Sequence, residues 1–170
     1  MRKRSKYKPK GVRLNTMLFV MQGMQKVDQV EGAGLTLKIK NHSALANITQ
    51  GKGTRHDVDI LIAAFNVTEA LAIRNIGQEY KTEIRAAQDC VLAMSRRGVA
   101  KDERFLFTGT EMQAVNLGME IHDAQLEVCT VRELELALDL VENTIRAGKA
   151  RAIESCQETV RNLAHLSEPA

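Results

Sequence analysis

The 170-residue chain has little of the material from which sheets are built. Aromatic residues make up 4% of it, Trp is absent, and there are only 2 prolines and 11 glycines. This is too little for a sandwich or barrel of short strands and turns. By contrast, 44% hydrophobic and 26% charged residues are close to the averages of soluble globular proteins. At this length, the composition predicts one folded domain that is mainly helical.

Cysteine and long apolar runs are also scarce. Cys90, Cys129 and Cys156 are separated by 39 and 27 residues and include no C-x-x-C pair. This spacing is typical neither of a disulfide framework nor of a zinc ribbon. No run approaches the roughly 20 apolar residues that span a bilayer, and the stretch 17–21 is too short for the core of a signal peptide. We therefore expect a protein of the reducing cytoplasm with no membrane partner.

The first thirteen residues contain no acidic residue, so the net charge of +3 hides a segregation of charge along the chain. Seven basic residues lie in this opening segment, and the chain after it carries 17 basic and 21 acidic residues, a charge of about −4. A basic arm on a mildly acidic body is typical of a tail that meets phosphate or an acidic protein surface. The alternative is a solvated, disordered terminus. The arm residues expected to bind a partner or nucleic acid are Arg2, Lys3, Arg4, Lys6, Lys8, Lys10 and Arg13.

Helix-start signals divide the rest of the chain. Thr54, Thr108 and Thr130 are each followed three residues later by an acidic residue, which is the arrangement of a capping box. Apolar residues at steps of three and four predict a helix after each of them and another from about Glu79, which Gly98 is expected to end. Shorter helical patterns cover 16–24 and 150–166. We predict an all-α fold: residues 1–13 form a basic, flexible arm, and residues 14–170 form one bundle of four to five main helices.

One passage departs from the helical period. Leu35, Leu37 and Ile39 alternate with polar residues, which is the period of a strand. We expect either one short extended segment or a loop pinned by its leucines, with a helix only over 41–50. The sequence 51–54, Gly-Lys-Gly-Thr, lacks the order of residues of a phosphate loop and is expected to connect two helices.

No spacing of residues is typical of a catalytic motif, because the four histidines lie apart and none belongs to H-E-x-x-H. The densest polar cluster is a row on one helix face, in which Glu120, Asp123 and Glu127 are candidates for an acidic contact stripe. A cation site there would need ligands from another helix. His122 shares an apolar stripe and is expected to be a hydrogen-bonded boundary residue. We expect no catalytic residue, no cofactor and no metal.

Several passages resemble small helical accessory proteins carried by proteobacterial phages and plasmids, which have no established activity. Besides the basic opening, they are Lys38–Leu45, Thr54-Arg55-x-Asp57, Ala63-x-x-Asn66-x-x-Glu69-Ala70 and Glu120–Gln125. The resemblance implies a mobile-element protein that acts by stoichiometric binding. Such a protein inhibits a host defence complex, as anti-CRISPR proteins do, or regulates the element's own replication and transcription.

Three functions stay open at this point. The first is a non-catalytic inhibitor that docks on a host nucleoprotein complex, for example a CRISPR effector, through the acidic stripe or the arm. The second is a DNA- or RNA-binding accessory factor whose arm binds phosphates and whose bundle forms a homodimer, since steps of three and four also fit a seam between two copies. The third is an enzyme with a carboxylate and histidine site around Glu120, His122, Asp123 and Glu127. We expect the first.

Overall fold

The computed structural model describes residues 16–148. The predicted basic arm and the predicted helix over 150–166 therefore lie outside the described residues. Within 16–148 the chain forms six α-helices and two single turns of 3-10 helix, and the all-α prediction is confirmed. The elements are α1 (Thr16–Gly23), η1 (Val27–Gln29), α2 (Ala33–Thr49), α3 (Arg55–Ile73), η2 (Gln78–Tyr80), α4 (Lys81–Val99), α5 (Gly109–Val128) and α6 (Val131–Arg146).

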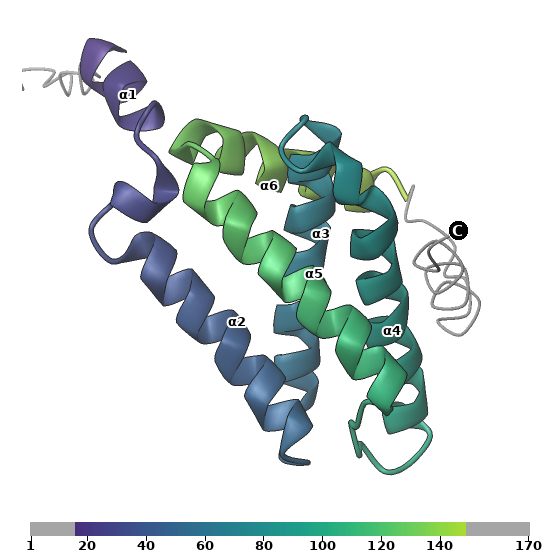
Figure 1. Cartoon of the computed structure of the whole chain (residues 1–170). Coiled ribbons are helices and arrows are strands. Elements are labelled where there is room, and N and C mark those ends of the chain that lie inside the picture. Colours follow the sequence, from purple (N-terminus) through teal and green to yellow (C-terminus); the bar gives the residue numbers. More distant parts are fainter. Residues whose placement is uncertain (1–15, 149–170) are drawn as a thin grey trace, which may run out of the picture.

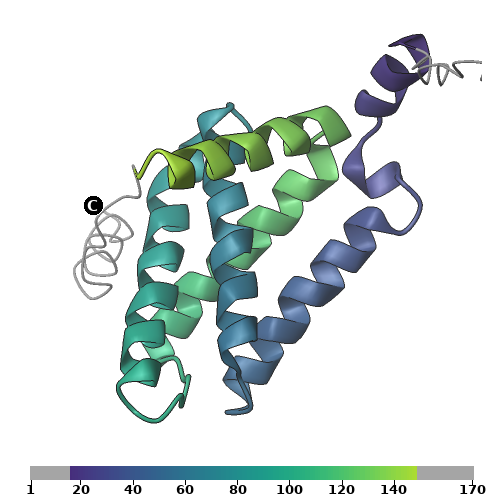
Figure 2. The same ribbon diagram turned by 180° about the vertical axis from the view of Figure 1, so that it is seen from behind.

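Helices α2 to α5 run alternately down and up, and α6 lies across one end of this bundle (Figures 1 and 2). Helix α3 is central, because it packs against α2, α4, α5 and α6. Helix α1 lies beyond the start of α2, next to the start of α6. Among the described residues no strand forms, and the only paired extended residues are Lys26 and Thr130, which form an isolated antiparallel bridge.

The main core lies between α2, α3, α4 and α5. Its largest fully buried side chains include Phe65 and Leu61 of α3 and Met94 of α4. A second apolar cluster fills the space between the end of α3, the end of α5 and α6. Burial of this much apolar surface holds the helices in fixed positions, so side chains on neighbouring helices meet in a defined register.

The three predicted capping boxes are confirmed. In each, the Thr hydroxyl accepts a hydrogen bond from the backbone N–H of the acidic residue, and the acidic side chain accepts one from the Thr backbone N–H. These contacts satisfy amide groups that have no partner inside the helix. The pairs are Thr54 with Asp57, Thr108 with Glu111, and Thr130 with Glu133. Residues 51–54 connect α2 to α3, as predicted.

The predicted extended segment is wrong, because α2 is one continuous helix that begins at Ala33. The alternating residues belong to its first two turns, where Leu35 and Ile39 are 63% and 57% exposed. Burial in α2 is concentrated in its second half, at positions that include Ala44 and Ile48. The apolar residues of the first half do not face the bundle, so their spacing carried no information about packing.

The predicted helix end at Gly98 is also wrong, since α4 continues through it to Val99. The ring of Phe105 packs against the bare Cα of Gly98, and a Cβ there would overlap the ring. Gly98 therefore provides a space for an aromatic side chain of the connection between α4 and α5, instead of a left-handed turn.

Candidate interaction surface on helices α2 and α5

The predicted acidic stripe lies on the side of α5 that faces α2, and two of its three members are paired within the chain. His42 Nε2 donates to Asp123 Oδ2 over 2.7 Å, and Lys38 Nζ donates to Glu127 Oε1 over 2.8 Å. Glu120 is exposed, and the structure gives it no ion pair among the described residues. The stripe is therefore partly neutralised by α2 and is not simply solvated.

The two pairs have the register of antiparallel helices. Lys38 and His42 are four residues apart on α2, and Asp123 and Glu127 are four apart on α5, so each base faces one acid. The hydrogen bond to Glu127 raises the pKa of Lys38, together with the negative charges of Glu127 and Asp123. Such half-exposed pairs contribute little to stability, so the apolar core holds α2 and α5 in place and the pairs form across the resulting surface.

A buried polar network lies below this surface. Asn41 Nδ2 donates to His122 Nε2 over 3.0 Å, and His122 Nδ1 lies 2.8 Å from the hydroxyl of Thr68. Because the Thr68 hydroxyl also donates to the carbonyl of Ala64 over 2.9 Å, its oxygen accepts from Nδ1–H of the imidazole. A neutral His122 that carries its proton on Nδ1 satisfies both ring nitrogens and the Thr68 hydroxyl.

The electrostatics of His122 agree with a neutral ring. Burial lowers its pKa to about 4, and the positive charges of His42 and Lys38 act in the same direction against the opposing charge of Asp123. Both ring nitrogens are occupied by hydrogen bonds, so the side chain has a structural role. The prediction of a hydrogen-bonded histidine is confirmed, although His122 is fully buried and not at a boundary.

Exposed apolar residues continue the surface beside the charge pairs. Leu35 and Ile39 lie at spacings of three and four from Lys38 and His42, so they share one side of α2 with the two bases. On α5, Leu117 is exposed three residues before Glu120. We call the set Leu35, Lys38, Ile39, His42, Leu117, Glu120, Asp123 and Glu127 the α2–α5 surface.

Other candidate positions do not join this surface. Cys129 is buried between α5 and α6, where burial raises the pKa of its thiol to about 11 and makes it a poor nucleophile. His56 is exposed in the first turn of α3. Over residues 16–148, no three His, Cys, Asp or Glu side chains lie close enough together to hold a metal ion. In the same range, none of the helices combines the length and the apolar character needed to cross a membrane.

Sequence reasoning found the acids of this surface and missed its bases. Lys38 and His42 lie 81 to 89 residues from their partners, a separation that no local pattern spans. Their matched spacing of four was the available signal, but it becomes informative only once 33–40 is known to be helical. The arm residues lie outside the described residues.

Comparisons with models of protein families, with curated proteins and with solved structures find no match for this chain. Its function is therefore inferred from the chemistry of the surface.

Proposed function

We propose that this protein acts by stoichiometric binding, and that it docks the α2–α5 surface on a host nucleoprotein complex, such as a CRISPR effector, and inhibits or remodels it. The observation that carries the proposal is the juxtaposition of exposed Leu35 and Ile39 with acidic groups on α5. Exposed apolar side chains rimmed by charged groups mark interaction sites.

The negative charge of the α5 acids in the α2–α5 surface favours a partner that binds nucleic acid. Proteins that hold nucleic acid present basic surfaces, and the acids of α5, Glu120 foremost, are complementary to such a surface. Charge complementarity of this kind accelerates the encounter and selects the partner. The seven basic residues of the arm supply the opposite charge, which suits a complex that contains both protein and nucleic acid.

A second candidate is a DNA- or RNA-binding accessory factor that uses the arm. It is favoured by the density of basic residues, since each phosphate contact releases counterions and the summed effect is strong at low salt. This binding would be independent of sequence and of the α2–α5 surface. The two candidates therefore differ in which part of the chain is needed.

The test is affinity purification from a bacterial lysate, with and without nuclease, of the full chain and of three variants. The first variant lacks residues 1–13, the second carries Leu35→Lys and Ile39→Lys, and the third carries Val99→Lys as a control at an exposed apolar residue at the far end of α4. We expect a defined protein complex that survives nuclease. The double variant should reduce its recovery by about tenfold or more, because a contact of about 1.4 kcal/mol corresponds to a factor of ten, while Val99→Lys has no effect.

The second candidate makes the opposite prediction. In that case nucleic acid is recovered without a defined protein, it is lost when residues 1–13 are removed or salt is raised, and the double variant behaves like the full chain. That result would overturn the docking proposal.

A further inference from the structure

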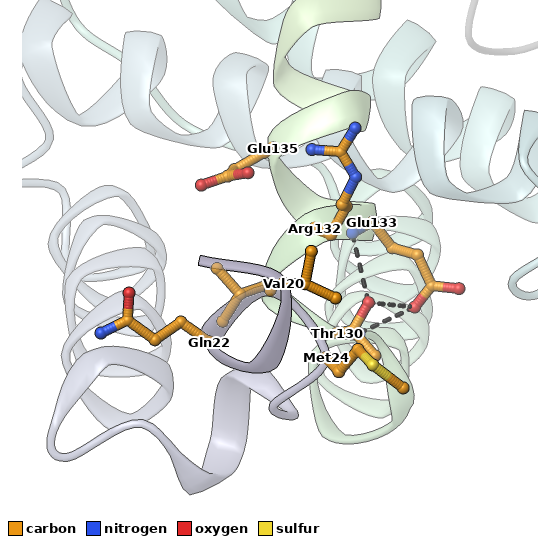
Figure 3. A pocket seen from close by; sticks show the side chains of 9 residues that line it. Val20, Gln22, Met24, Thr130, Arg132, Glu133 and Glu135 are labelled. Carbon is orange, nitrogen blue, oxygen red and sulfur yellow. Dashed lines mark hydrogen bonds between the residues drawn. The ribbon is translucent and has the colours of Figure 1, made fainter. Parts of the chain in front are cut away.

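We draw no further inference here: the strongest candidate, the exposed apolar face of helix α1 with the hollow that the end of this helix lines against the start of α6 (Figure 3), carries nothing, because its lining contains Arg132 as well as Glu133 and Glu135 and so selects no partner by charge, and nothing among the described residues 16–148 shows what covers it.

Discussion

At the scale of single residues, the most consequential group is the imidazole of His122. It joins three helices, because Asn41 belongs to α2, Thr68 to α3 and His122 to α5. A buried polar group is costly unless its hydrogen bonds are made, and here both nitrogens are satisfied in one tautomer. The protonated ring would instead direct N–H at the amide donor of Asn41, so protonation forces this contact to rearrange.

This arrangement predicts a dependence of stability on pH. The folded pKa of His122 is about 4, below its ordinary value of 6.5. Between these values the unfolded chain binds a proton that the folded chain does not, so the free energy of unfolding falls as the pH falls. The stabilisation is fully present above pH 6.5 and is lost progressively toward pH 4. Between about pH 7 and about pH 5 the expected loss is about 2 kcal/mol, measurable by urea unfolding.

Two variants separate His122 from other titrating groups. His122→Gln should lower stability at neutral pH and remove most of the dependence in this window. His56→Gln, at an exposed position, should leave the dependence as it is. If wild type and His122→Gln have the same slope, the folded imidazole titrates normally and the assigned network is incorrect.

At the scale of the helices, local signals were reliable where the responsible contacts are local. The boxes at Thr54, Thr108 and Thr130 were predicted because a cap needs only residues three apart. The helix over 33–40 was missed because its apolar residues do not pack on the bundle. The role of Gly98 was missed because its partner, Phe105, lies in the following connection and reaches it only through the turn of the chain.

The end of α4 and the start of α5 are tied by a further pair that sequence did not indicate. Arg97 donates to both oxygens of Glu111 over 2.5 and 2.6 Å and to the carbonyl of Leu106 over 3.1 Å. Burial opposes ionisation of Glu111, but the hydrogen bonds from Arg97 and Thr108 outweigh it and lower its pKa. A bidentate pair of this kind is geometrically specific, and it holds the connection that carries Phe105 against Gly98.

The contact between Gly98 and Phe105 predicts that replacing Gly98 by Ala lowers stability, whereas most such replacements inside helices raise it. In an ordinary helix interior, replacing Gly by Ala stabilises by about 1 kcal/mol. Gly98→Ala should instead destabilise by about 1–3 kcal/mol, because the added methyl group displaces a buried ring. Gly109→Ala is the matched control, since nothing lies within 4 Å of its added Cβ at the start of α5. Thermal unfolding of both variants decides the matter: a stabilised Gly98→Ala protein would mean that the ring does not occupy this space.

At the scale of the whole molecule, the bundle and α1 are distinct in packing. No residue before Val27 belongs to the described buried core. Val27 itself is buried, and its backbone N–H donates to the carbonyl of Cys129 over 3.1 Å. Gln25 is held by a hydrogen bond from the N–H of Val131 to its carbonyl over 2.9 Å. The folded unit of the described chain therefore begins near Gln25, and α1 is attached to it through the junction with α6.

Removal of residues 1–24 should consequently leave the bundle folded. The circular dichroism per helical residue should be retained, and at high dilution the free energy of unfolding should fall by less than about 1 kcal/mol, as for changes away from the core. If the shortened chain instead unfolds without cooperativity, α1 is part of the core.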